Sequence, residues 1–226
     1  CSPRMVPTYS SVRALGTNPI SYSAPADKLP DFVFDAAMTS VAGNKIVLAS
    51  RLDVPLSKGW IADKNGNPIM EEININELDN EDESKNLENR YNKGYISSSV
   101  DLLPFGATRE IGSHKGYSMA VVVDILAGIL NGTRTAPTGD YKNQGHFLAA
   151  YDINAFIDTK EFKELMDRYL QSMLDLPSNS EGKKVIYAGY LESIEEEKRM
   201  ASGIPLHKEV VDWFKKISND LKTESL

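Results

Sequence analysis

The stretch "GSHKGYSMAVVVDILAGILNG", residues 112–132, sets a glycine-flanked lysine immediately before one of the most apolar runs in the chain. Its pattern predicts a helix over about residues 114–131, ended by the last glycine of the stretch. The positive end of a helix dipole disfavours a cation at the helix start. Lys115 therefore indicates an anion near this turn, which Gly112 and Gly116 would allow to approach the backbone. The alternative is a lysine that points into water beside a glycine-rich turn.

Composition narrows the class of protein. The chain has 226 residues, a formal net charge of −7, 41% apolar and 25% charged residues, which is ordinary for a globular protein. The negative charge is the wrong sign for binding a nucleic-acid backbone. The longest apolar run, residues 119–130, is too short to span a bilayer. Because Cys1 is the only cysteine, no disulfide framework is expected. We expect a cytoplasmic protein that binds neither nucleic acid nor membrane.

Short apolar runs predict the strands. Residues 31–40 and 44–52 read as two strands joined near Gly43. Residues 146–156 alternate well enough for a strand, and residues 184–189 read as a strand that ends at a turn. Strands and helices mix without a strict βαβ repeat, so the pattern predicts an α/β protein.

Two further helices are predicted in the second half of the chain. Residues 158–174 are amphipathic, and Asp158 and Glu161 have the spacing of a capping box. Residues 206–222 form the last predicted helix, which Pro205 opens. The apolar residues expected to be buried are Phe162, Leu165, Tyr169 and Met173 in the first helix and Val210, Trp213, Phe214 and Ile217 in the second.

Residues 71–95 are rich in acidic side chains and predict a surface insertion. Asp79, Glu81 and Glu83 alternate as in a calcium loop, but Ser84 stands where that loop needs glycine. No H-E-x-x-H motif occurs, and no Cys/His spacing fits zinc. We expect no metal site.

Three polar residues leave alternatives open. Asp35 follows an apolar strand, where a carboxylate often contacts a ribose hydroxyl, or it caps the following turn. Asp124 lies within the apolar helix and either needs a buried partner or marks the solvent edge. Histidine titrates near neutrality, so His114 could transfer a proton, pack in the protein or lie against a ligand ring.

Neither G-x-G-x-x-G nor G-x-x-x-x-G-K-[ST] occurs in the chain. The chain instead resembles the malate/L-lactate dehydrogenase type II family, which also includes ureidoglycolate dehydrogenases, diketogulonate reductases and sulfolactate dehydrogenases. The matching stretches are "LGTNPI" (15–20), "FDAAMTSVAGNKI" (34–46), "GWIADKNGNP" (59–68), "LLPFGATREIGSHKGYSMAVVVDILAGILNG" (102–132), "GHFLAAYDINAF" (145–156) and "YAGYLESIEEEKRMASGIPL" (187–206).

The resemblance implies a non-Rossmann NAD(P)-binding fold of the L-sulfolactate/malate dehydrogenase type, with a mixed sheet flanked by helices. It implies NAD or NADP bound in an extended form, and a homodimer with its active site near the subunit interface. We expect residues 1–190 to form the cofactor-binding domain. Residues 191–226 would form a helical segment that packs on an N-terminal domain outside this chain.

The resemblance also assigns cofactor contacts. The implied contact residues are Asp35, Ala36, Ala37, His114, Lys115, Gly189, Tyr190 and Leu191. Lys115 would lie at the dinucleotide phosphates, and the turn at Gly189 would close over the cofactor. Cys1 falls near another contact position. The family usually has P-G-E or P-G-Q where this chain has Ala188-Gly189-Tyr190, so the glycine turn is kept while the third side chain differs.

The implied activity is hydride transfer between a nicotinamide cofactor and a 2-hydroxy or 2-oxo acid of the malate or L-lactate class. The family's catalytic histidine and its carboxylate-binding arginine lie in roughly a hundred residues before the point matching Cys1. No catalytic residue is therefore assigned, and His114 is the candidate within the chain. The alternatives are a non-catalytic nucleotide-binding or dimerisation module, if the chain is complete, and specificity for ureidoglycolate or diketogulonate.

Overall fold

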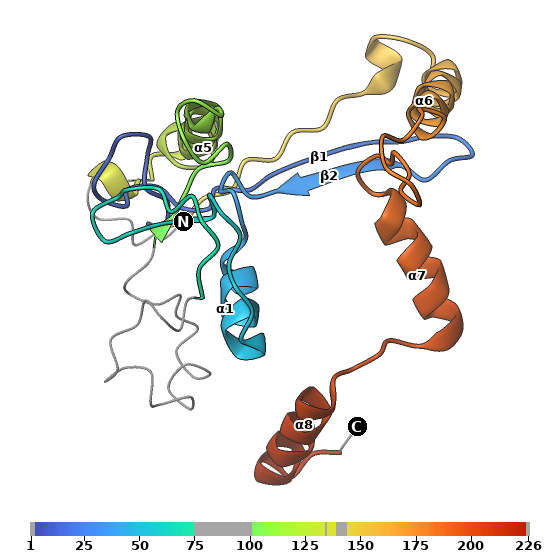
Figure 1. The fold of residues 1–226 in the computed structure, drawn as a ribbon. Helices are drawn as coiled ribbons and strands as arrows, with labels where there is room; N and C mark the ends of the chain where they lie inside the picture. The colour runs from blue at the N-terminus through green and yellow to red at the C-terminus, as the bar shows by residue number, and fades with distance from the viewer. Residues whose placement is uncertain (1–2, 75–100, 134, 139–143, 225–226) are drawn as a thin grey trace. The chain divides into compact units, whose positions relative to one another are not determined.

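A computed structural model describes most of the chain, namely residues 3–74, 101–133, 135–138 and 144–224. The chain divides into two compact units (Figure 1). The first unit combines Cys1–Tyr22 with Phe34–Asp152, and the second combines Ser23–Val33 with Ile153–Leu226. The domain boundary expected near residue 190 stays a prediction.

The described elements mix strands and helices, as predicted. In chain order they are β1 (Ile20–Ala24), β2 (Phe32–Ala36), α1 (Gly43–Leu52), β3 (Ile61–Ala62), β4 (Asp101–Leu102), α5 (Ser113–Ala127), η1 (Ile129–Asn131), η2 (Ala136–Thr138), η3 (Ile153–Ala155), α6 (Thr159–Leu174), α7 (Tyr190–Ser202) and α8 (Lys208–Leu221). Strands β1 and β2 pair and run side by side (Figure 1), and the division between the units passes through both of them. Strands β3 and β4 form an antiparallel pair, with Ile61 opposite Leu102.

Residues 44–52, predicted as a strand, form helix α1 instead. Ile46 and Ala49 are both buried, and a spacing of three residues places them on one helical face. The prediction gave too much weight to the β-branched pair at positions 46 and 47, whose strand preference tertiary packing overrides. The core around α1 contains Val41, Ile46, Ala49, Leu56, Ile61 and Leu102, with Trp60, Ile69 and Ile73 at its edge.

Helix α5 confirms the helix predicted from the opening stretch. The short helix η1 and a left-handed Gly132 (φ 78°) follow it. Gly116 is buried, and a Cβ atom added there would strike the Phe105 carbonyl oxygen and lie 2.6 Å from the Phe105 backbone nitrogen. The close approach at Gly116 is therefore to the chain's own backbone, which corrects the expectation of a ligand there.

Helix α6 confirms the predicted cap. The Asp158 carboxylate accepts hydrogen bonds from the backbone N–H groups of Lys160 (3.0 Å) and Glu161 (3.1 Å). The predicted apolar stripe is partly confirmed: Phe162 and Met173 are half-buried, whereas Leu165 and Tyr169 are exposed and the fully buried residue is Leu170. Leu170 packs with Ala26 and Tyr187, and with the half-buried residues Leu29, Phe32, Met166, Leu174 and Tyr190.

A second carboxylate of α6 holds a loop of the same unit. Asp167 accepts hydrogen bonds from the backbone N–H groups of Asp27 (3.1 Å), Lys28 (2.9 Å) and Leu29 (3.1 Å). Desolvation opposes its ionisation, but these donors and the nearby Lys28 charge hold the pKa of Asp167 below its usual value. The loop at residues 27–29 is thus tied to the middle turn of α6.

The two later predicted strands do not form. Residues 146–152 have no regular structure, and Leu148 is 92% exposed, so no strand partner in the described ranges covers it. Residues 184–189 form no strand either, although the Val33 N–H donates to the Ala188 carbonyl oxygen (3.0 Å). Apolar alternation alone does not supply the neighbouring strand that a ladder needs.

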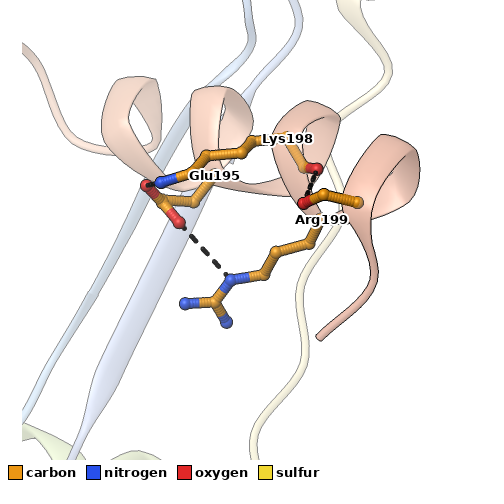
Figure 2. Close-up of polar contacts among 4 residues, drawn as sticks. Glu195, Lys198 and Arg199 are labelled. Atoms are coloured by element: carbon orange, nitrogen blue, oxygen red, sulfur yellow. Dashed lines mark hydrogen bonds and ion pairs between the residues drawn. The ribbon is translucent and has the colours of Figure 1, made fainter. Parts of the chain in front are cut away.

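Figure 2 shows that the ion pairs of α7 stay within the helix. The Glu195 carboxylate pairs with Lys198 Nζ (3.2 Å) and Arg199 Nε (3.4 Å), and the Ser202 hydroxyl donates to the Lys198 carbonyl oxygen (2.8 Å). Exposed pairs of this kind contribute little to stability because water and salt screen them. They support the helix without fastening it to another element.

Helix α8 forms where it was predicted, but its aromatic residues are not buried. Trp213 is 55% exposed and makes an edge contact with Phe214, with ring centroids 5.1 Å apart. Val210 and Phe214 are also exposed, so the predicted burial of this face is not found. Of the helices in the described ranges, none is long and apolar enough to cross a membrane. Residues 75–95 of the predicted acidic insertion lie outside the described residues, and so does Cys1.

Candidate functional site

The N-terminus of α5 has no side-chain cap, although backbone carbonyl oxygens accept the N–H groups of Gly112, Ser113 and Lys115. Its N-cap residue, Gly112, is buried and left-handed (φ 104°), makes no side-chain cap, and is followed by no acidic residue in the first turn. The nearest atoms to a Cβ added at Gly112 are Lys115 Cδ (3.6 Å) and Cε (3.9 Å), so the lysine stem folds back over the glycine. Lys115 is exposed, and no ion pair involving it occurs in the described part of the chain. Backbone dipoles and ammonium group together favour an anion here.

Arg109 is a second cation at the same turn, which sequence reasoning missed. The Gly112 N–H donates to the Arg109 carbonyl oxygen (3.3 Å), which closes the turn. Arg109 Nη1 lies 2.7 Å from His114 Nδ1, and a guanidinium can only donate, so the ring nitrogen accepts. The bond orients the His114 ring. The signal in the sequence for a second cation at this turn was that Arg109 stands three residues before Gly112.

Two side-chain contacts hold α5 against the N-terminal segment. The hydroxyls of Thr8 and Ser113 lie 2.8 Å apart. Asn18 Nδ2 donates to the Ala120 carbonyl oxygen (2.8 Å) and to Asp124 Oδ1 (2.9 Å). Asp124 therefore has the polar partner that a partly buried acid needs, and Asn18 is a further residue that sequence reasoning did not single out.

The segment Asp35–Ala37 lies at the end of β2. Asp35 is exposed and makes no side-chain hydrogen bond to the following turn within the described residues, so the capping alternative finds no support. Ala36 packs against the buried cluster of Met5, Leu15, Met38 and Ala120, the last of which belongs to α5. The structure thus places this segment and the α5 helix in the same unit and at the same apolar cluster.

Ala37 lines a cavity of about 300 Å³ in the first unit. Its other lining residues are Arg4, Thr17, Ala42, Gly43, Asn44 and Val47. The cavity reaches the N-terminus of α1, where the N-cap Ala42 supplies no side-chain acceptor and the first turn has no acid. The positive end of the α1 dipole near Arg4 favours an anionic group.

The remaining predicted contacts belong to the second unit. Gly189 is the left-handed N-cap of α7 (φ 95°), and a Cβ atom there would lie 2.9 Å from both Asp31 O and Val33 N. Its conformation therefore serves close packing of the backbone. Tyr190 is half-buried against Tyr187, with ring centroids 5.3 Å apart, while Leu191 is exposed. Burial raises the pKa of Tyr187, whose hydroxyl donates to the Pro30 carbonyl oxygen (2.8 Å).

The chemistry of the described site is that of anion binding. Arg109 and Lys115 are the cations at the α5 turn, and Arg4 lies in the cavity beside Ala37. Nowhere in the described ranges do three or more histidine, cysteine, aspartate or glutamate side chains gather as metal ligands. The proton-transfer role of His114 stays a prediction.

Comparison with known proteins identifies the family. The family model described as malate/L-lactate dehydrogenase matches residues 1–215. Malate/(S)-sulfolactate dehydrogenase of Methanothermus fervidus is 31% identical over 98% of this chain, and malate dehydrogenase of Pyrococcus horikoshii is 29% identical over 99%. The chain spans 58% of the length of each of these relatives.

Solved structures support the predicted fold. The malate dehydrogenase from Entamoeba histolytica matches 98% of this chain with a TM-score of 0.79 and 24% identity, and the match covers 59% of that protein. The malate dehydrogenase from Pyrococcus horikoshii matches 99% with a TM-score of 0.73 and 27% identity, and the match covers 56% of it. The α/β fold of this dehydrogenase type is therefore confirmed, and the chain belongs to the malate/L-lactate dehydrogenase family.

Proposed function

We propose that the whole protein is an NAD(P)-dependent oxidoreductase that transfers a hydride between a nicotinamide cofactor and a 2-hydroxy or 2-oxo acid of the malate or L-lactate class. The observation that carries the proposal is the N-terminus of α5, which has no side-chain cap and carries Lys115 in its first turn, with Arg109 bonded to the neighbouring His114, in a chain of this family. The net charge of −7 repels anions from the protein as a whole, so cations concentrated at one turn are needed for an anion to bind there.

The residues present fit a dinucleotide. Lys115, exposed and folded over Gly112, suits the diphosphate together with the positive end of the α5 dipole. Asp35, exposed at the end of β2, suits a ribose hydroxyl. The family resemblance is the ground for the further proposed contacts, which are His114, Ala36, Ala37, Gly189, Tyr190 and Leu191. The bound nicotinamide supplies the hydride acceptor or donor.

The cavity beside Ala37 suits a position next to the acid substrate. Relatives include an L-sulfolactate dehydrogenase, a ureidoglycolate dehydrogenase from Escherichia coli and a Δ1-pyrroline-2-carboxylate reductase. These substrates share a carboxylate next to the reacting carbon. Arg4 and the start of α1 line a volume of about 300 Å³, at the lower limit for small-molecule sites. Because the family's carboxylate-binding arginine is expected before the point matching Cys1, we propose that this cavity borders the substrate and does not hold its carboxylate.

Turnover by the intact protein tests the function. We expect it to oxidise NADH or NADPH when given oxaloacetate, pyruvate or sulfopyruvate, measured as loss of the reduced-nicotinamide absorbance. The ratio of kcat/KM for the two nicotinamides decides between NAD and NADP. Cofactor binding without turnover on any oxo acid, including oxidised ureidoglycolate and diketogulonate, would instead establish the non-catalytic module.

The family resemblance also supports a homodimer located in the cytoplasm. Sedimentation of the intact protein at several concentrations tests the first statement, and cell fractionation tests the second. A monomer at all concentrations would refute the dimer without affecting the proposed reaction.

A further inference from the structure

Asn18 occupies an unusual position. It is 1% exposed and adopts a left-handed backbone conformation (φ 40°), which among non-glycine residues favours asparagine and aspartate. Its two amide protons are directed at acceptors one helical turn apart on α5, Ala120 O (2.8 Å) and Asp124 Oδ1 (2.9 Å). The amide oxygen is buried, and the described residues give it no hydrogen-bond partner. Stability alone does not favour a buried amide that leaves one atom unsatisfied.

The residue before Asn18 is bonded to the other side of the site. The Thr17 carbonyl oxygen accepts a hydrogen bond from the Met38 N–H (2.8 Å), and Met38 follows Ala36 and Ala37 directly. Thr17 also lines the cavity that Ala37 lines. Thr17 is therefore bonded to Met38, just after β2, and Asn18 is bonded to α5.

A second fastening lies at the start of α5. The hydroxyls of Thr8 and Ser113 are 2.8 Å apart, and Ser113 is 1% exposed. Lys115 lies in the sequence between Ser113, which is bonded to Thr8, and Ala120, which is bonded to Asn18. Translation or rotation of the first turns of α5 would break at least one of these contacts.

We propose that Asn18 is a positioning residue for the cofactor, which fixes the spacing between the Ala36-Ala37 side of the site and the Lys115 side. Asn18 does not itself touch the cofactor. The inference rests on the proposed cofactor site. Its physical basis is that small misplacements of binding groups cause large losses of affinity and rate.

Variants of Asp124 test the positioning role. Asp124 is half-buried, and the bond from Asn18 to the Ala120 carbonyl oxygen remains when the Asp124 side chain is changed. Asp124→Leu removes the acceptor, and Asp124→Asn retains an acceptor oxygen without charge. Gln171→Leu is the matched control, since it removes a side-chain bond to Asp175 (2.8 Å) on α6. The intact protein is titrated with NADH and with NADPH, and the cofactor KM, kcat and urea-unfolding midpoint are measured for each variant.

We expect Asp124→Leu to raise the cofactor Kd and KM about tenfold. Asp124→Asn should stay within about twofold of the parent, as should Gln171→Leu. Asn18→Ala should raise the cofactor Kd and KM more than Asp124→Leu does. If Asn18→Ala fails to fold, the Asp124 variants decide whether the proposal holds.

Two results would overturn the proposal. One is an Asp124→Leu protein that binds the cofactor as tightly as the parent. The other is an equal loss in Asp124→Leu and Asp124→Asn, since charge and not the hydrogen bond would then matter. A parent protein that binds neither nicotinamide would refute the proposed function itself, which separates the two failures.

Discussion

Helices α5 and α6 begin in opposite ways. Helix α6 starts at Asp158, whose carboxylate accepts the N–H groups of Lys160 and Glu161, so its end is satisfied from within the chain. Helix α5 starts at a left-handed glycine, Gly112, with no side-chain cap and with Lys115 in its first turn. The difference teaches that a helix can start on a side-chain cap or on a glycine turn closed by backbone hydrogen bonds, and we propose that the second kind of start, with its exposed lysine, faces the cofactor.

The glycine inside the first turns of α5 gives the largest expected effect. Gly116→Ala places a methyl group against the Phe105 backbone, and overpacking of this kind costs roughly 3 kcal/mol of unfolding free energy. We expect the thermal midpoint to fall by about 10 °C and cofactor binding to be lost. Calorimetry and a cofactor titration measure both. An unchanged midpoint would mean that α5 and Phe105 do not pack as described.

The lysines of the two first turns allow a direct contrast. Lys115→Met removes a charged hydrogen-bond donor and should weaken NADH or NADPH binding about 10- to 100-fold. Lys160→Met, at an exposed position paired with Glu164 (3.9 Å), should leave binding unchanged. Fluorescence titration at low and high salt measures both constants. Equal effects of the two variants would remove the distinction between the helices.

The N-cap glycine should contribute both fold and affinity. Gly112→Ala costs about 1–2 kcal/mol through its left-handed backbone. Its methyl group would lie in van der Waals contact with the Lys115 stem, so strain in this turn should weaken binding several-fold. Gly132→Ala has a similar backbone strain with nothing within 4 Å of the new methyl group, and serves as the control. If Gly132→Ala impaired binding as much, global destabilisation and not the α5 turn would be responsible.

The cap of α6 should matter for stability alone. Asp158→Ala removes both accepted hydrogen bonds and should lower the free energy of unfolding by about 1 kcal/mol. Urea denaturation measures this loss, and the cofactor Kd should not move. A change in Kd would show that the α6 terminus also serves the ligand.

The smallest expected effect is a pH dependence in α6. The pKa of Asp167 is lowered in the folded protein because desolvation is outweighed by the N–H groups of Leu29, Lys28 and Asp27 and by the Lys28 charge. A lowered folded pKa contributes stability above the ordinary aspartate value, about 3.9, and that stability is lost as pH falls through the folded pKa. Asp167→Asn should lose this contribution at neutral pH and show a flatter acid limb of the midpoint-against-pH curve. Parallel curves for parent and variant would contradict it.

Local signals predicted the helices that carry their own start and stop residues. The Asp158–Glu161 spacing gave the start of α6 correctly. The helix predicted to end at Gly132 divides into α5, which ends at Ala127, and η1, which Gly132 follows. Residues 44–52 and 146–156 were assigned to strands because β-branched and alternating apolar residues favour strands locally. The helical burial of Ile46 and Ala49 depends on Leu56 and Leu102, whose contact with α1 the local sequence does not specify.

The candidate site was predictable where charge conflicts with the helix dipole. Lys115 before an apolar helix stood out for that reason. Asn18, Arg109 and Arg4 were missed because their roles come from contacts with distant segments or from a cavity that only the folded chain forms. The apolar face of α8 was expected to be buried from its periodicity, which identifies an apolar face but not the surface that covers it.

The two tryptophans are divided between the two compact units. Trp60 is half-buried at the α1 core with the Lys45 ammonium 5.6 Å from its ring centroid, whereas Trp213 on α8 is mostly in water. Each unit therefore carries its own intrinsic fluorophore in a different polarity, the first emitting further to the blue. Replacing either indole by phenylalanine would leave a single optical reporter, so that melting of each half of the chain can be followed separately without any added dye.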